Sequence, residues 1–302
     1  LCNSLGNVGL SLILMFTVFR DERDTARILG TTLTLFVISL VILGVFYRKA
    51  KPAYNRKYWK FGIKYSLPIV PHGISQVLLA QFDRIMIRSM VGDAAAGIYS
   101  LAGNVQLVLT VLTDSIATVW STWFYQKMDA NDTKDIQHRA FQLCRMFAAL
   151  CVGMIAIAPE MIWILGGKQY EQATYVAVPL IMVSFVLFVY NVVVDAEYYS
   201  QKTTYIMYCT LAAALIDIVL NLFFVSRFGF VAAAYTTLTS YIFYLIFHMQ
   251  LSRKLLGFAI VRWSQVLTLG MAVVLAAVIS LLLRQNILLR YLLELVLLAV
   301  VG

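Results

Sequence analysis

The chain has 302 residues, of which 61% are hydrophobic and only 13% are charged, and its formal net charge is +9. Soluble domains carry about 25% charged residues, so the composition excludes water as the main solvent of this protein. A basic excess can indicate nucleic-acid binding, but here the Lys and Arg residues flank hydrophobic runs instead of forming a basic face. We therefore expect no nucleic-acid partner.

Hydrophobic runs that are long enough to cross a bilayer follow one another along the chain. A spanning helix needs about 20 mostly apolar residues, and about ten such windows fit. This predicts an all-α, polytopic transmembrane helix bundle. The predicted spans cover residues 1–19, 26–47, 61–87, 97–120, 140–158, 174–199, 204–225, 230–249 and 263–283, followed by a helix that starts at residue 287 and is cut at residue 302. Because the first residue is Leu and the last run is short, we expect a fragment.

The loops between the predicted spans indicate topology and chemistry. Residues 48–60 hold six Lys and Arg residues, which places this segment in the cytoplasm by the positive-inside rule. Residues 126–139 mix acids and bases and are interpreted as a solvated loop or a short surface helix. The four Cys and three His residues are scattered, so we expect no metal site. No catalytic motif or phosphate-binding Gly-rich loop predicts an enzyme or a bound cofactor.

An internal repeat relates the second predicted span to the eighth. The sequence TTLT at residues 31–34 recurs 205 positions later at residues 236–239, and Arg48-Lys49 recurs as Arg253-Lys254 at the same shift. Both helices would run in the same direction, as in the parallel repeats of some transporters. We therefore predict that residues 1–50 are the last two helices of an N-terminal lobe, 51–60 a basic cytoplasmic linker, 61–254 a six-helix C-terminal lobe and 255–302 an additional helix pair.

Polar residues gather on one side of the predicted span over residues 61–87. At 100° per residue, a stripe about a third of the helix circumference wide is polar, and ionisable groups at membrane depth are costly unless they face a partner or a cavity. Ordinary hydrogen bonds between helices would explain the stripe as well as a cavity would. The stripe contains Lys64, His72, Ser75, Gln76 and Asp83.

The same span carries two prolines, Pro68 and Pro71, followed by Gly73. Each proline removes a backbone donor and weakens the helix. We expect a kink here, which is a hinge in one interpretation and a static bend in the other.

Two later spans repeat a polar spacing of seven and then four residues. The first trio is Ser184, Asn191 and Asp195, and the second is Thr210, Asp217 and Asn221. Asp217 falls near the predicted middle of the bilayer and is the better candidate for a cation or proton site. Asp195 lies near the cytoplasmic end, and Glu197 beside it is interpreted as solvated.

Asp114 and Arg145 fall at equal predicted depth on neighbouring spans. They form either a structural ion pair or a gate in which Asp114 holds Arg145 until an anionic substrate arrives. Asp114, Asp195, Asp217 and Asn221 are the ion-coupling candidates.

Residues 61–102 resemble the seventh and eighth helices of bacterial O-antigen and capsule (Wzx-type) flippases of the MOP exporter superfamily. The resemblance rests on SLPIVPH, FDRIMI and GIYS, and on residues 159–180, which are similar to that family's outer connection into its tenth helix. It implies a MOP/MATE-like two-lobe architecture with the first lobe incomplete, in the bacterial inner membrane. By motif, only Asp83 and Arg84 carry over as site residues.

The resemblance implies that the protein moves polyprenyl-diphosphate-linked oligosaccharide units from the cytoplasmic to the outer leaflet, among membrane lipids and polysaccharide assembly proteins. Lys64 and Arg145 are our candidates for contacting the diphosphate, with His72, Gln76, Asp83 and Arg84 completing the predicted substrate site. An ion-coupled multidrug exporter and a membrane glycan polymerase or ligase are the alternatives. The short outer connection at residues 159–173 disfavours the polymerase, and many intramembrane charges disfavour a scaffold without transport.

Overall fold

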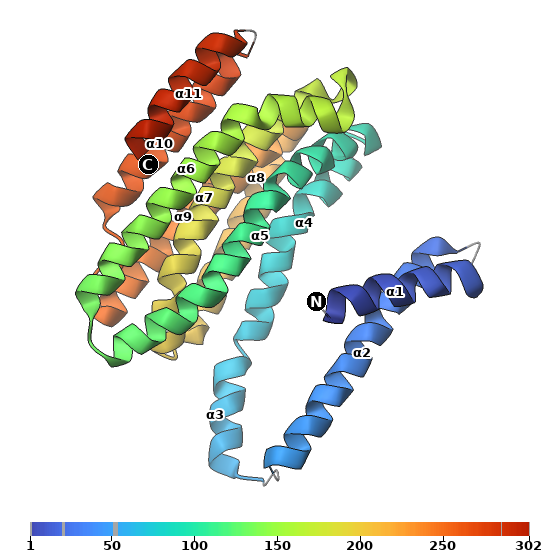
Figure 1. The fold of residues 1–302 in the computed structure, drawn as a ribbon, viewed down its shortest axis with the longest axis vertical. Coiled ribbons are helices and arrows are strands. Elements are labelled where there is room, and N and C mark those ends of the chain that lie inside the picture. Colours follow the sequence, from blue (N-terminus) through green and yellow to red (C-terminus); the bar gives the residue numbers. More distant parts are fainter. Residues whose placement is uncertain (1, 20–21, 51–53, 285, 302) are drawn as a thin grey trace. The chain divides into compact units, whose positions relative to one another are not determined.

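A computed structural model describes residues 2–19, 22–50, 54–284 and 286–301, without the side chains of residues 2–4 (Figure 1). Part of the predicted linker, residues 51–53, therefore lies outside the described residues. The chain divides into two compact units, Leu1–Phe61 and Gly62–Gly302. Within the described residues there are eleven α-helices, one short 3-10 helix and no strand, so the all-α prediction is confirmed.

The first unit contains the helix pair α1 (Cys2–Thr17) and α2 (Arg23–Ala50) and ends within α3 (Arg56–Ser66). The two helices approach closely at Gly30, where an added Cβ would lie 2.7 Å from the Cα of Ser11. Thr31 donates a hydrogen bond of 2.9 Å to Oδ1 of Asn7 across the pair. A small residue and an interhelical hydrogen bond are the usual means by which helices associate in membranes.

The second unit is a helix bundle built around α7 (Thr174–Tyr199), which is buried along most of its length. Around it lie α4 (Ile69–Met90), α5 (Asp93–Asp129), α6 (Thr133–Gly166), α8 (Thr203–Phe228) and α9 (Phe230–Leu256), with the 3-10 helix η1 (Lys168–Ala173) before α7. The last two helices, α10 (Trp263–Leu282) and α11 (Ile287–Val301), pack on α6. The strongly apolar sequence of α7 thus forms the core of the bundle.

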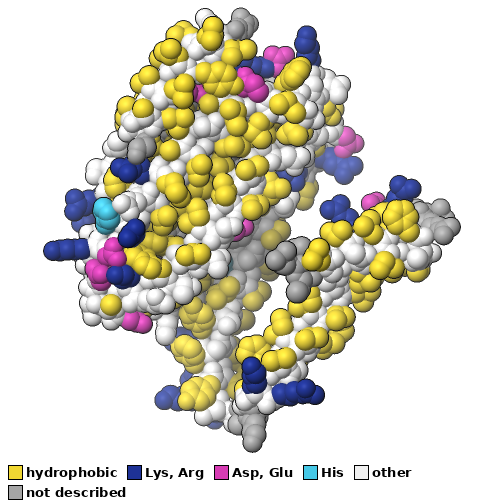
Figure 2. Space-filling model, viewed as in Figure 1, with side chains coloured by type: hydrophobic (Ala, Val, Ile, Leu, Met, Phe, Trp, Pro, Cys, Tyr) yellow, Lys and Arg dark blue, Asp and Glu magenta, His cyan; other side chains and the backbone are white. Residues whose placement is uncertain are grey.

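The outside of the helices is as apolar as a bilayer requires. Figure 2 shows hydrophobic side chains along the flanks of the helices, whereas Lys, Arg, Asp and Glu gather mainly near the helix ends. Seven of the described helices are long and apolar enough to cross a membrane, which makes the chain a multi-pass membrane protein. α4 does not qualify because its polar stripe lowers its hydropathy, and α1 and α11 have only 16 and 15 residues.

Two predicted boundaries need correction. The predicted single span over residues 61–87 is two helices, α3 (Arg56–Ser66) and α4, separated at Leu67 and Pro68. Residues 126–139 are not a loop, because α5 continues to Asp129 and α6 begins at Thr133. Asp132 makes this short turn possible, since its side chain caps α6 by accepting a hydrogen bond from the backbone N–H of Asp135.

Candidate functional site

A cluster of hydrogen-bonded polar side chains lies inside the second unit, centred on Asp83 of α4. Asp83 is only 3% exposed. Its Oδ2 accepts hydrogen bonds of 2.6 Å from the hydroxyls of Tyr99 on α5 and Thr237 on α9, and its Oδ1 accepts one of 2.7 Å from Nδ2 of Asn221 on α8. One carboxylate therefore connects four helices.

A second carboxylate, Asp217 of α8, extends this cluster. It is 1% exposed, and its Oδ2 accepts a 3.2 Å hydrogen bond from Nδ2 of Asn221. Thr236 donates to Oδ1 of Asn221 at 2.6 Å. Asp217 Oδ1 is buried and has no hydrogen-bond partner. We call Asp83, Tyr99, Asp217, Asn221, Thr236 and Thr237 the acidic cluster.

The acidic cluster has no cationic partner among the described residues. Arg84 follows Asp83 in the chain, but its guanidinium points toward Gly103 of α5, where an added Cβ would lie 2.8 Å from Nη2. No ion pair to Asp83 or Asp217 occurs in the part of the chain that is described. Buried charges are expensive unless they are compensated, and carboxylate, amide and hydroxyl oxygens suit hard cations. The oxygen atoms of the cluster are therefore of the kind that can hold protons or a small hard cation.

A second set of hydrogen bonds joins α4, α8 and α9, which are three of the four helices that Asp83 connects. Nδ1 of His72 is 2.7 Å from Oγ1 of Thr210, which is 3.1 Å from the hydroxyl of Tyr244. Nε2 of Gln76 donates to the same Tyr244 hydroxyl at 3.3 Å. His72 and Thr210 are buried. These contacts fasten α4 to its neighbours about two turns away from Asp83.

The predicted polar stripe therefore faces the interior of the helix bundle. His72, Ser75 and Asp83 are buried among the other helices, which corresponds to the alternative of hydrogen bonds between helices. Lys64 does not continue the stripe. It is exposed on α3, and the helix is interrupted between α3 and α4.

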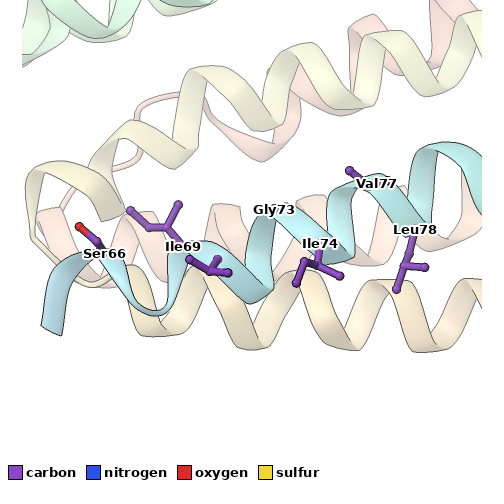
Figure 3. A pocket seen from close by; sticks show the side chains of 7 residues that line it. Ser66, Ile69, Gly73, Ile74, Val77 and Leu78 are labelled. Atoms are coloured by element: carbon purple, nitrogen blue, oxygen red, sulfur yellow. The ribbon is translucent and has the colours of Figure 1, made fainter. Parts of the chain in front are cut away.

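The interruption at Pro68 also creates an apolar depression on the opposite face of α4. Its volume is about 660 Å³, and Figure 3 shows side chains along it, including Ile69, Ile74 and Val77. Pro71 is exposed in the first turn of α4, and no atom lies within 4 Å of a Cβ added at Gly73. Space beside the interruption leaves room for bending, although a hinge role remains a prediction.

The other predicted site residues are not brought together. Asp114 and Arg145 are both exposed, and no ion pair joins them. Lys64 lies on α3, which makes no contact with the helix α6 that carries Arg145. Asp195 is buried near α5, where it accepts hydrogen bonds from Ser121 at 2.8 Å and Tyr125 at 3.3 Å.

Sequence reasoning missed several of the residues that form these contacts. Glu197 was expected to be solvated, but it is fully buried against His248. Tyr244 was not singled out, and Tyr99 was noted only as part of the GIYS motif, with no role assigned to it. Thr236 and Thr237 did give a signal, as part of the TTLT repeat. The equivalent residue Thr31 also donates to an Asn Oδ1 of the preceding helix, as Thr236 does.

Part of the chain is similar to a described family. Residues 2–128 match a family model described as Polysaccharide biosynthesis protein. Two curated proteins of Haemophilus influenzae, Lsg locus putative protein 1 and an uncharacterized membrane protein, are each 22% identical, over 68% and 71% of this chain. These alignments cover 53% and 54% of the two relatives, so the chain spans about half their length.

Solved structures show the same fold. The lipid II flippase MurJ in an inward closed conformation is similar over 99% of this chain and 65% of its own, with a TM-score of 0.64 and 12% identity. A MOP superfamily transporter from Pyrococcus furiosus is similar over 74% of this chain and 53% of its own, with a TM-score of 0.58 and 18% identity. The second unit and α1–α2 thus define a membrane protein with the fold of MOP superfamily transporters.

Proposed function

We propose that the protein is a transporter that moves polyprenyl-diphosphate-linked oligosaccharides from the cytoplasmic to the outer leaflet of the bacterial plasma membrane by alternating access. The family match supports a polysaccharide precursor as the substrate, and the fold supports transport. The observation that carries ion-coupled transport is the acidic cluster, because Asp83 and Asp217 are buried and form no ion pair with any described residue. Polysaccharide assembly proteins are the partners that this role implies.

The acidic cluster is where an ion gradient would act on the protein. Binding of a cation or of protons neutralises two carboxylates that otherwise stay uncompensated at membrane depth. The same hydrogen bonds hold α4, α8 and α9 together. Binding and release of the cation or protons at the acidic cluster would therefore change how these helices pack. A ligand that binds one arrangement better shifts the protein toward it.

Lys64 and Arg145 are the proposed contacts for the diphosphate. Both are exposed on the second unit, so both are free to meet a charged headgroup. Moving a diphosphate across about 30 Å of hydrocarbon requires a path with compensating positive charge. α3 and α4 meet at Pro68, which is the proposed bending point during the cycle.

The test uses the full-length protein with Lys64→Gln and Arg145→Gln combined. We expect surface polysaccharide to disappear while the protein remains at normal levels in the membrane. The matched control combines Lys202→Gln and Arg253→Gln, which also removes two exposed cations and should leave the polysaccharide unchanged. Normal polysaccharide in the first double variant would contradict the assignment of the diphosphate site.

An ion-coupled drug exporter is the second candidate, because buried acids such as Asp83 and Asp217 also suit the transport of organic cations. Deleting the gene distinguishes the two functions. Loss of surface polysaccharide with unchanged drug susceptibility supports the flippase, and the opposite result supports the exporter.

A further inference from the structure

A buried acid–base pair, Glu197 of α7 and His248 of α9, lies apart from the acidic cluster. Both side chains are 0% exposed, and Nδ1 of His248 is 2.6 Å from Oε1 of Glu197. The remaining polar atoms, Oε2 of Glu197 and Nε2 of His248, have no hydrogen-bond partner in the part of the chain that the structure describes. Buried polar atoms are rarely left without a partner, so this pair is more than a completed structural contact.

The surroundings of the pair are aromatic. The ring of His248 meets that of Tyr244 at a centroid distance of 4.4 Å and that of Tyr190 at 4.8 Å, both edge to face. No Lys or Arg forms an ion pair with Glu197 or His248 among the described residues. The other titratable groups within electrostatic range are Tyr190, Tyr198, Cys209 and Tyr244, which face Glu197, and His72, which faces His248. None of these supplies a compensating positive charge at neutral pH.

Charge balance then determines how many protons the pair holds. With one proton between Nδ1 and Oε1, the pair is neutral overall, whether the proton lies on the imidazole or on the carboxyl group. Losing that proton leaves a net charge of −1, and adding a second leaves +1, on two fully buried side chains. Because a buried net charge is costly, the state with one proton is strongly favoured while the pair is enclosed. The two groups must be treated as one titrating unit.

We propose that Glu197 and His248 form a proton-binding site that takes up one proton when α7 closes against α9. In an opened or unfolded chain above the titration range of free histidine, the hydrated pair exists as carboxylate and neutral imidazole and holds no shared proton. Closure transfers one proton from water to the pair. α7 ends two residues after Glu197, and the backbone N–H of Lys202 bonds to the Glu197 carbonyl at 2.9 Å. The pair therefore lies beside a helix end that can admit water.

The pair also has a route to the rest of the bundle. Tyr244 contacts His248, and its hydroxyl accepts a hydrogen bond from Gln76 and forms another with the hydroxyl of Thr210. Asp83 lies on the same helix as Gln76, and Asp217 on the same helix as Thr210. A change in how α9 packs at His248 is thereby transmitted to helices that form the acidic cluster.

Proton linkage tests the proposal. If the folded protein holds one proton more than the unfolded chain, the free energy of unfolding falls as pH rises. The slope of this fall corresponds to the release of one proton on unfolding. The measurement is the apparent Tm of the purified full-length protein against pH, above the titration range of free histidine. Glu197→Gln keeps a neutral hydrogen bond to His248 but removes the proton uptake, so its profile should be flatter by one proton. His248→Gln leaves a buried acid that still needs a proton, and should keep the slope.

The matched control is Glu171→Gln, which removes a carboxyl group whose side chain is 63% exposed, and its profile should parallel that of the wild type. Parallel profiles for the wild type and Glu197→Gln would overturn the proposal, as would equal losses of Tm in both pair variants at every pH. If Glu197→Gln does not fold, infrared spectra of His248→Gln decide. A protonated carboxyl band that persists above neutral pH in His248→Gln and is missing from the double variant Glu197→Gln/His248→Gln supports the proposal, and absence of that band from His248→Gln overturns it.

Discussion

The charged residues of the second unit fall into two groups with opposite environments. Asp83 and Asp217 are 3% and 1% exposed, and Asp83 accepts hydrogen bonds from three other side chains and Asp217 from one. Lys64, Asp114 and Arg145 are exposed and form no ion pair among the described residues. The buried acids therefore govern how the helices pack, whereas the exposed charges are available to ligands. Substitutions in the first group should affect both stability and transport, and those in the second group transport alone.

The largest effect is expected for Asp83→Ala. Tyr99, Asn221 and Thr237 would each lose an acceptor in the interior, and a hydrogen bond to a charged group contributes about 1.5–3 kcal/mol. We expect no transport and a clearly lowered Tm, by polysaccharide staining and thermal unfolding. Ser89→Ala, on the exposed side of α4, is the control. If Asp83→Ala were as stable as the wild type, the buried acids would not govern helix packing, and the proposed difference between them and the exposed charges would be wrong.

A smaller effect is expected for Pro68→Ala, which restores a backbone donor between α3 and α4. A continuous helix would resist bending, so transport should slow by less than about tenfold, or about 1.4 kcal/mol in activation free energy, while the Tm stays equal or rises. The rate of translocation in vesicles measures this, with Pro179→Ala as a comparison for a proline inside α7. An unchanged rate in Pro68→Ala would show that the interruption is only a static bend.

The smallest effect is expected at the exposed turn between α5 and α6. Nζ of Lys127 donates a hydrogen bond of 2.9 Å to Oδ2 of Asp132, and this contact lowers the pKa of the Asp132 carboxyl group. A carboxyl group with a lowered pKa stabilises the folded state above its unfolded pKa, and this contribution is lost as pH falls through the folded value. Asp132→Ala should lower the stability through the lost helix cap, whereas Asp132→Asn should retain the cap and lose the pH dependence. Thermal unfolding at neutral and acidic pH separates these effects, and a large loss of transport in either variant would contradict them.

Much of the fold follows from hydropathy, because each bilayer-spanning helix carries its own signal over about 20 residues. The sequence also located Asp83, Asp217 and Asn221 by the cost of charge at membrane depth. It could not decide which way the stripe on α4 faces, since helical periodicity gives a face but not its neighbour. The burial of Glu197 shows the same limit: distance from a helix end predicts solvation only when no other helix covers that end.

Ion dependence of translocation tests the central claim most directly. The full-length protein is reconstituted in vesicles with a polyprenyl-diphosphate-linked oligosaccharide, and translocation is measured with and without a sodium or proton gradient, for the wild type and for Asp217→Asn. Asn keeps the size and hydrogen-bonding capacity of Asp217 but removes its charge. We predict that a gradient accelerates the wild type and has no effect on Asp217→Asn. Equal gradient dependence in both proteins would contradict the assignment of the acidic cluster as the coupling site.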